Sequence, residues 1–516
     1  MIEGINADIA PIIQRKAANF SWITKYLNIA PKIRVSEVMT KSERADFTRL
    51  SIRYSLTMAV TIRFLGAVET VTGSRFLLEN GTHKVLVDAG LYQGLKELRQ
   101  KNWDSFPANI KEIDAVVITH AHLDHCGYLP KLVEQGFKGQ IHLTEFTSKL
   151  AQIVLRDSAS LQLEDAKYAM KKGYSKHRNP KPLYTLEDAE KAISNFTTHR
   201  YHERLEIAPE TFLTFFRSGH ILGASSVLIE FYGKRFLFTG DLGRPNHPIL
   251  NPPDSIPHEK LDALIIESTY GDREHPTKSN ALADAINRTF SRGGTILIPA
   301  FAIDRTEILL MTIKELIKNK SIPNIPIYVD SPMALAALYE YRAAIKMKSP
   351  EIRSDLINAN EDPFDVGDLR EAKTVEESKA LNNPENPCII ISASGMATGG
   401  RVVHHLEWLL PDLKNTVLLV GYQAIGTRGH LLLSGVKFLK MYGNEVPVKA
   451  EVVQIEEFSV HGDAGELINW MRTGSAPEQI FVIHGEKSSA LAFSEKIKSE
   501  INWNATVPVD DRAFSI

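Results

Sequence analysis

The sequence predicts an α/β protein, and three observations carry this prediction. Short apolar runs of strand length recur along the chain, and stretches with helical periodicity separate them. Several of these runs end directly in polar side chains and glycine, which is where open α/β sheets usually place their sites. The chain has 516 residues, of which 43% are hydrophobic and 24% charged, so it is long enough for two domains with separate cores.

The first half of the chain divides into an extension and a β-rich block. Residues 1–57 carry nine Lys or Arg against five Asp or Glu with weak periodicity, so we expect an amino-terminal extension of unknown role. Alternating, β-rich sequence begins at Met58. The basic run 171–181 is more typical of a solvated loop than of a polyanion contact. Strands are expected at 84–87, 113–118, 225–232 and 235–240, and helices at 145–172 and 185–196.

From about residue 262 the pattern changes to strands that alternate with helices, which is typical of a Rossmann-like insertion. The expected strands are 263–267, 295–299, 325–330, 388–392 and 416–421. A helix between the second and third of them places Leu309, Ile313, Leu316 and Ile317 on one face. Strands at 449–455 and 480–483 and a helix near 463–472 then return to the first pattern. We therefore expect residues 58–270 and 431–516 to form one domain, with residues 271–430 inserted as a second domain.

Composition excludes several classes of protein. A net charge of −2 and an isoelectric point near 6.8 mean that any polyanion site depends on local basic groups or metal ions. Cys126 and Cys388 are the two cysteines, which fits a reducing compartment and excludes a disulfide scaffold. No apolar run reaches the roughly 18 residues of a spanning helix, and the acidic, mixed amino terminus does not resemble a secretory signal. We expect a cytoplasmic protein with no membrane partner.

One short string, residues 119–127, predicts a metal site. It places His120, His122, Asp124 and His125 directly after the apolar run 113–118, and a helix is expected to begin at Cys126. His120 and His122 are two residues apart and so point to one side of an extended segment. Imidazole and carboxylate together suit Zn²⁺ and similar metals. A polar loop rich in histidine by chance is the alternative interpretation, and ligand runs of this density rarely arise that way.

Three further loops add donors to this string. Gly219-His220 stands between glycines that allow close backbone approach, Gly240-Asp241 follows a strand, and His484-Gly485 follows another strand. Taken alone, each of these residues is more typical of an ordinary loop. Together with the first string they make seven donors, which is the number that two metal ions need if one carboxylate bridges them.

The order of these donors resembles that of the metallo-β-lactamase superfamily. The resemblance implies that His120, His122 and His220 hold one Zn²⁺ and that Asp124, His125 and His484 hold a second Zn²⁺. Asp241 would bridge the two ions. The implied pair activates a water molecule and stabilises charge on substrate oxygens, and Asp124 is also a candidate to orient that water or to receive its proton.

The sequence between Asp241 and His484 resembles that of one particular family within this superfamily. The strings around Glu267 (residues 266–273) and His461 (residues 458–463) resemble motifs A and B of the β-CASP nucleases, and the His484 string resembles their motif C. Histidine in motif C is associated with the members that act on RNA. The resemblance covers about 58–516 and implies a metallo-β-lactamase αββα sandwich with an inserted Rossmann-like β-CASP domain. It also implies a metal-dependent phosphodiesterase that hydrolyses single-stranded RNA, as in the nucleases of RNA 3′-end processing.

Phosphodiester hydrolysis also needs a proton donor and a phosphate contact. His461 titrates near neutrality and is the expected donor, and Glu267 is expected to hold its imidazole protonated and oriented. Backbone N–H groups at the start of a helical stretch are expected to cradle phosphate, with arginine as the charge partner. The expected substrate-binding residues are Arg305, Ser394, Gly395, Gly400 and Arg401.

Several alternatives stay open on the sequence alone. A small-molecule hydrolase of the thioesterase or lactonase type would share the metal site but needs no inserted domain with phosphate loops. A non-catalytic RNA-processing scaffold would have lost ligands, whereas all seven donors are present here. The sequence leaves undecided whether cleavage is internal or proceeds from the 5′ end, whether DNA is also cut, which metal is native, and whether the chain pairs as a homodimer.

Overall fold

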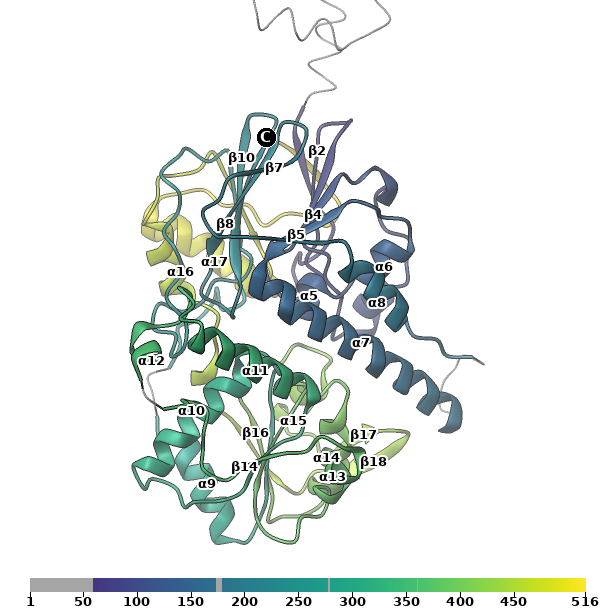
Figure 1. Cartoon of the computed structure of the whole chain (residues 1–516), viewed down its shortest axis with the longest axis vertical. Coiled ribbons are helices and arrows are strands. Elements are labelled where there is room, and N and C mark those ends of the chain that lie inside the picture. Colours follow the sequence, from purple (N-terminus) through teal and green to yellow (C-terminus); the bar gives the residue numbers. More distant parts are fainter. Residues whose placement is uncertain (1–58, 173–178, 277–278, 360) are drawn as a thin grey trace, which may run out of the picture. The chain divides into compact units, whose positions relative to one another are not determined.

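Two β-sheets packed face to face form the first domain (Figure 1). The computed structural model describes residues 59–172, 179–276, 279–359 and 361–516. Residues 60–516 form one compact unit. The first sheet has the order β21-β1-β2-β3-β4-β5-β6 and the second β20-β11-β10-β9-β8-β7. The strands of the first sheet are β1 (Thr61–Phe64), β2 (Phe76–Glu79), β3 (Lys84–Val87), β4 (Ala115–Val117), β5 (Gln140–Thr144), β6 (Phe196–His199) and β21 (Ala513–Ser515). Those of the second are β7 (Leu205–Ala208), β8 (Thr211–Arg217), β9 (Ser225–Phe231), β10 (Lys234–Phe238), β11 (Ala263–Glu267) and β20 (Gln479–Ile483).

Strand alternation explains how each sheet buries both faces. In β4, Val116 packs toward helices while Val117 packs between the sheets, and in β11 Ile265 points between the sheets while Leu264 points outward. The outer face of the first sheet is covered by α5 (Leu123–Cys126), α6 (Leu129–Glu134), α7 (Glu145–Lys172) and α8 (Leu186–Ile193). That of the second is covered by α16 (Ala464–Met471) and α17 (Lys487–Ile501). The layers are thus αββα, as expected.

The inserted domain contains a third sheet with the order β14-β13-β15-β12-β16-β19, in which all pairings are parallel. Its strands are β12 (Ile296–Pro299), β13 (Ile327–Val329), β14 (Leu369–Glu371), β15 (Ile389–Ser392), β16 (Thr416–Leu419) and β19 (Glu451–Gln454). A separate hairpin joins β17 (Phe438–Met441) to β18 (Asn444–Pro447). The helices are α9 (Ala281–Ser291), α10 (Arg305–Lys318), α11 (Pro332–Lys346), α12 (Ser354–Asn358), α13 (Val375–Ala380), α14 (Arg401–Leu409) and α15 (Arg428–Leu433). Short 3-10 turns (Ile110–Glu112, Glu456–Phe458) and α4 (Lys96–Gln100) complete the elements.

Two elements differ from the sequence expectations. The third sheet extends beyond residue 430, the limit expected for the insertion, because β19 at 451–454 pairs in parallel with β16. In place of one helix from Cys126 the structure has a single turn, α5, which ends at Cys126 and contains Asp124 and His125, and a separate helix α6 from Leu129. Part of the basic run 171–181 lies outside the described residues. No helix in the described part of the chain is long and apolar enough to cross a membrane.

An aromatic cluster between the two sheets gives the first prediction. Phe481 is buried on β20, and its ring centroid lies 4.9 Å from that of Phe64 and 5.0 Å from that of Phe514. We expect Phe481→Ala to lower the free energy of unfolding by about 3–5 kcal/mol because it leaves a cavity between the sheets. Chemical denaturation measures the change. Phe438→Ala, at a side chain that is 59% exposed, should change stability by less than about 0.5 kcal/mol, and equal effects would contradict the role of the cluster.

Candidate metal centre and active site

The donors expected from the sequence gather where strands of the two sheets of the first domain end. His120 and His122 follow β4, His220 lies in the loop between β8 and β9, and Asp241 follows β10. His484 directly follows β20. Because these strands end at one edge of the sandwich, segments far apart in sequence place their side chains in one buried region.

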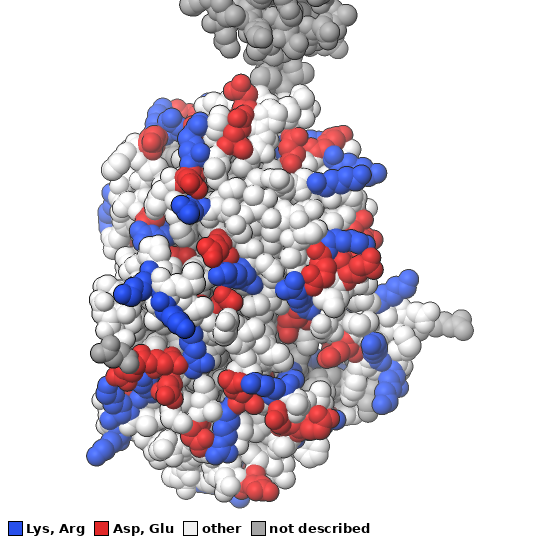
Figure 2. Space-filling model, viewed as in Figure 1, with Lys and Arg blue, Asp and Glu red and all other residues white. Residues whose placement is uncertain are grey.

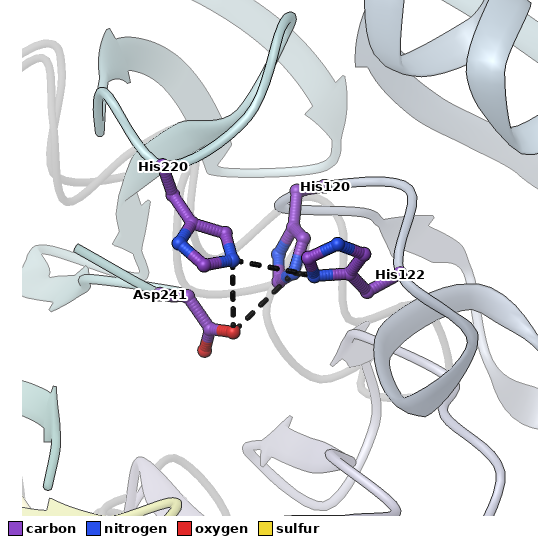
Figure 3. Close-up of side chains that lie close together, drawn as sticks. All are labelled: His120, His122, His220 and Asp241. Atoms are coloured by element: carbon purple, nitrogen blue, oxygen red, sulfur yellow. Dashed lines mark hydrogen bonds and ion pairs between the residues drawn. The ribbon is translucent and has the colours of Figure 1, made fainter. Parts of the chain in front are cut away.

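The first cluster contains His120, His122, His220 and Asp241 (Figure 3). His122 Nδ1 lies 3.1 Å from His120 Nε2 and 3.2 Å from His220 Nε2. Asp241 Oδ2 lies 3.4 Å from His120 Nε2 and 3.5 Å from His220 Nε2. The side chains of His120 and His220 are fully buried. Four potential ligand atoms therefore face one point.

The second cluster contains Asp124, His125 and His484. His484 Nε2 lies 3.2 Å from His125 Nε2 and 3.4 Å from Asp124 Oδ2. The other oxygen of Asp241, Oδ1, faces this cluster at 3.3 Å from His125 Nε2 and 3.4 Å from His484 Nδ1. Asp241 thus presents one oxygen to each cluster, which is the arrangement that a bridging carboxylate requires.

Side chains behind the clusters orient three of the imidazoles. Asp88 Oδ2 lies 2.8 Å from His125 Nδ1, and Asp88 also accepts hydrogen bonds from the backbone N–H and the hydroxyl of Thr119. Thr119 Oγ1 lies 3.1 Å from His120 Nδ1, and Thr269 Oγ1 lies 3.1 Å from His484 Nδ1. Sequence reasoning missed Asp88, Thr119 and Thr269 in this role. The carboxylate at the end of the strand 84–87 was the one available signal.

The chemistry of the clusters fits a divalent metal. Burial lowers the pKa of His120 to about 3 and that of His122 to about 4, so both rings are neutral near pH 7 and offer lone pairs. His122 Nε2, His220 Nδ1 and Asp241 Oδ1 are buried with no hydrogen-bond partner among the described residues. Nitrogen pairs 3.1–3.2 Å apart approach the edge of a tetrahedron around Zn²⁺, roughly 3.3 Å. Neutral nitrogen donors whose lone pairs converge on one point need a cation there to bind.

His461 and Glu267 lie beside the clusters. His461 Nδ1 lies 3.0 Å from Glu267 Oε2, and the His461 ring centroid lies 4.4 Å from that of His220. Glu267 is fully buried, and its Oε1 accepts a hydrogen bond of 2.6 Å from the backbone N–H of Leu242. Burial opposes charge on His461, but Glu267 and Asp241 outweigh it and raise its pKa above the usual value. The structure therefore brings together His461, the expected proton donor, and Glu267, which was expected to hold its imidazole.

A cavity of about 1810 Å³ opens over this region and extends between the two domains. Its lining includes His461, residues of the inserted domain and five residues of the metal clusters (His122, Asp124, His220, Asp241 and His484). Of the expected substrate-binding residues, Arg305, Ser394, Gly400 and Arg401 line it. Arg305 is 5% exposed, and its Nε and Nη1 have no hydrogen-bond partner among the described residues.

Two of the expected phosphate contacts are placed differently. Arg401 Nη1 donates to Asp330 Oδ1 at 2.6 Å and to the carbonyl of Ala372 at 2.9 Å, so the insertion already neutralises this guanidinium. Gly395 packs against Phe301, where a Cβ would lie 2.7 Å from the ring, and its small size serves this close approach. The sequence could not distinguish these roles, because a glycine or an arginine in this segment has the same sequence pattern whether it contacts a ligand or another part of the protein.

Comparisons with known proteins agree with this fold and site. Residues 71–281 match the metallo-beta-lactamase superfamily model, residues 306–432 the Beta-Casp domain and residues 445–508 the Zn-dependent metallo-hydrolase RNA specificity domain. A ribonuclease of Thermus thermophilus is 34% identical over 433 residues, which is 83% of this chain and 94% of that protein. An RNase J-like protein of Methanocaldococcus jannaschii is 33% identical over 87% of this chain and 98% of its own. The transcription termination factor FttA of the same organism is 30% identical over 89% of this chain and 72% of its own.

The αββα sandwich and its buried His/Asp clusters define a metal-dependent hydrolase of the metallo-β-lactamase superfamily that binds divalent metal. The inserted domain and the similar proteins identify the family within this superfamily. The chain belongs to the β-CASP family of that superfamily.

The position of Asp241 between the two clusters gives a prediction on metal content. Asp241→Ala removes a carboxylate that faces both clusters. We expect metal affinity to fall by more than the roughly 10–100-fold that the loss of an outer partner causes. Elemental analysis of the purified variant measures the retained metal. His142→Gln is the matched control because His142 is buried against His199, outside both clusters, and metal retained equally by both variants would contradict the assignment.

Proposed function

We propose that this chain is a metal-dependent ribonuclease that hydrolyses phosphodiester bonds of single-stranded RNA with two Zn²⁺ ions. The observation that carries the proposal is Arg305, a buried cation whose Nε and Nη1 lack partners among the described residues, in the same cavity as His461 and the metal clusters. Such a cation is suited to an anionic substrate and is not needed by a thioesterase or lactonase. The names of two relatives, a ribonuclease and an RNase J-like protein, support RNA as the substrate.

The surface charge also favours recognition inside the cavity. Figure 2 shows Lys and Arg interspersed with Asp and Glu over the visible face, without an extended basic field. The net charge of the chain is −2. RNA therefore gains little from long-range attraction to this face, and its phosphates are expected to bind at local cations and at the metal ions.

We assign the metal ligands as the sequence suggested. His120, His122 and His220 would hold one ion, Asp124, His125 and His484 the other, and Asp241 both; two clusters with a shared carboxylate support this division. When bound, the ions supply an activated water and neutralise charge on the phosphoryl oxygens. Asp124, whose side chain is 19% exposed, can orient that water or accept its proton.

The remaining steps belong to side chains of this chain. Arg305 donates Nε–H and Nη1–H to phosphoryl oxygens, which satisfies the two unpaired nitrogens. Glu267 accepts a hydrogen bond from the Nδ1–H of the protonated His461 and holds the ring toward the clusters. His461 then releases its Nε2 proton to the departing oxygen as the phosphodiester bond breaks. Ser394 and Gly400 line the cavity and are proposed to contact the RNA backbone.

We also propose the expected domain division, with residues 58–270 and 431–516 around the insertion at 271–430, apart from β17, β18 and β19, which pack with the inserted domain. A cytoplasmic location is proposed as well. Two cysteines that are both buried and free support a reducing compartment.

Cleavage of end-labelled oligonucleotides tests the function. The zinc-loaded full chain is expected to cut single-stranded RNA carrying a 5′-phosphate or 5′-triphosphate faster than matched DNA. His461→Ala should lower kcat by about 10²–10⁴-fold with unchanged metal content, because it removes the proton donor and no ligand. His202→Ala, at a side chain that is 52% exposed, is the control. Product sizes distinguish internal cuts from release of mononucleotides. Hydrolysis of a thioester or lactone without any cut in nucleic acid would overturn the proposal.

The pair of Glu267 and His461 gives a prediction on pH dependence. The acid form of His461 is the active form, so the rate falls as pH rises through its pKa. Glu267 is the largest influence that raises this pKa. We expect Glu267→Gln to shift the alkaline limb of the pH–rate profile toward lower pH. Rates of RNA cleavage between pH 5 and pH 9 measure the limb, and a shift toward higher pH would contradict the assigned proton donor.

A further inference from the structure

Two of the ligand candidates, His122 and His220, have a buried ring nitrogen without a hydrogen-bond partner among the described residues. The rings of His120 and His125 each have a side-chain partner at the nitrogen that faces away from their cluster, and Thr269 contacts His484 at Nδ1. His220 Nδ1 is buried and has no such partner among the described residues. Metal-binding imidazoles usually depend on a partner of this kind for their orientation. The position of His220 therefore depends on the backbone of its own loop.

The His220 loop (residues 218–224) is a tight turn between β8 and β9. The backbone N–H of Ser218 donates to the carbonyl of Ala224 at 3.1 Å. Gly223 has a φ of +85°, and a Cβ there would lie 2.3 Å from the backbone nitrogen of Thr147. Its carbonyl accepts hydrogen bonds from Thr144 and Thr147 at 2.6 and 2.7 Å. The first domain thus holds the carbonyl side of the loop tip.

The N–H groups of the loop tip point the other way, to side chains of the inserted domain. The N–H of Leu222 donates to the hydroxyl of Tyr341 at 3.0 Å, and that of Gly223 donates to Glu351 Oε2 at 2.6 Å. Leu222 and Tyr341 are fully buried, and Glu351 is 8% exposed. A buried N–H without an acceptor is costly, so these two contacts are constraints on the loop.

The two acceptors are themselves held in place. The hydroxyl of Tyr341, on α11, donates to Asp304 Oδ1 at 2.8 Å, which leaves its oxygen free to accept from Leu222. Asp304 Oδ2 lies 2.9 Å from His247 Nε2, and His247 follows the Asp241 loop. The carbonyl of Glu351 accepts from the N–H of Asn251 at 2.8 Å. Hydrogen bonds thus link the start of α10 to segments next to two ligand loops.

Apolar packing continues across the same boundary. Leu222, Tyr341, Leu250 and Ile352 belong to one contiguous buried cluster that also includes side chains of the first and third sheets. The inserted domain therefore shares a core with the first domain at the point where the His220 loop lies.

We propose that Tyr341 and Glu351 are positioning residues that complete the metal site from the inserted domain by fixing the backbone of the His220 loop. In this arrangement the insertion does more than cover the substrate, because ligation by His220 depends on how the insertion docks. The proposal rests on the metal site and is independent of the nature of the substrate.

Zinc affinity of the full chain, measured by competition with a chelator, tests this role. Tyr341→Phe keeps the ring and leaves Leu222 N–H without its acceptor. We expect zinc affinity to fall roughly 10–100-fold, as on loss of other outer partners, and excess zinc to restore occupancy. Tyr328→Phe is the matched control, because its hydroxyl accepts from the exposed Arg370 elsewhere in the insertion. Zinc affinity equal in the two variants and the wild type would overturn the proposal.

Glu351 provides a second and independent comparison. Glu351→Gln retains an oxygen that can accept from Gly223, and it should bind zinc close to the wild-type affinity. Glu351→Ala removes the acceptor and should lose affinity as Tyr341→Phe does. If Tyr341→Phe fails to fold, this pair carries the test, and equal zinc affinities for Glu351→Gln and Glu351→Ala would refute the role of the acceptor.

Discussion

The carboxylate of Asp241 is the contact on which the rest of the site depends. One oxygen faces the buried imidazoles of His120 and His220 and the other faces His125 and His484, so a single side chain spaces the two clusters. This side chain can serve both because it leaves β10, a strand in the middle of the second sheet, with loops from the first sheet directly opposite. The face-to-face packing of two sheets is thus the condition for the metal chemistry. The aromatic and aliphatic core between the sheets sets the separation at which the strand ends meet.

Much of this arrangement could be predicted because its signals are local. A buried strand followed by His120, His122, Asp124 and His125 is visible in a short window of sequence, and α7 begins and ends at the expected residues. Pairing between distant segments leaves no such signal. The strand 449–455 was expected, but its place beside β16 in the inserted sheet depends on docking that no local pattern encodes. The same reason hid Asp88 and Thr119, whose roles arise only when β3 and β4 lie side by side.

The arginines of the insertion show where motif reasoning reaches its limit. Arg401 stands at the start of α14 among glycines, as a phosphate contact would, yet Asp330 and a backbone carbonyl occupy it. Arg305 has a less distinctive sequence context, and within the described residues its Nε–H and Nη1–H stay unpaired inside the cavity. The two arginines differ in whether a counterion offsets the cost of desolvation. A buried guanidinium without a partner is unfavourable unless an anion arrives, whereas Arg401 already has its counterion.

The junctions of the insertion explain why catalysis and substrate binding belong to one folding unit. The chain leaves the first domain just after Glu267, at the end of β11, and returns at His461, just before α16. These two residues are 194 positions apart, yet their side chains approach to 3.0 Å. Leu242 fixes Glu267 through its backbone N–H, and Gly243 forms an isolated bridge with His461, so the Asp241 loop holds both junctions. A domain that moved as a rigid body on loose linkers would separate the pair. Because Glu267 and His461 stand at these junctions, the position of the insertion is coupled to the proposed proton donor by the chain connectivity and by the contacts of the Asp241 loop.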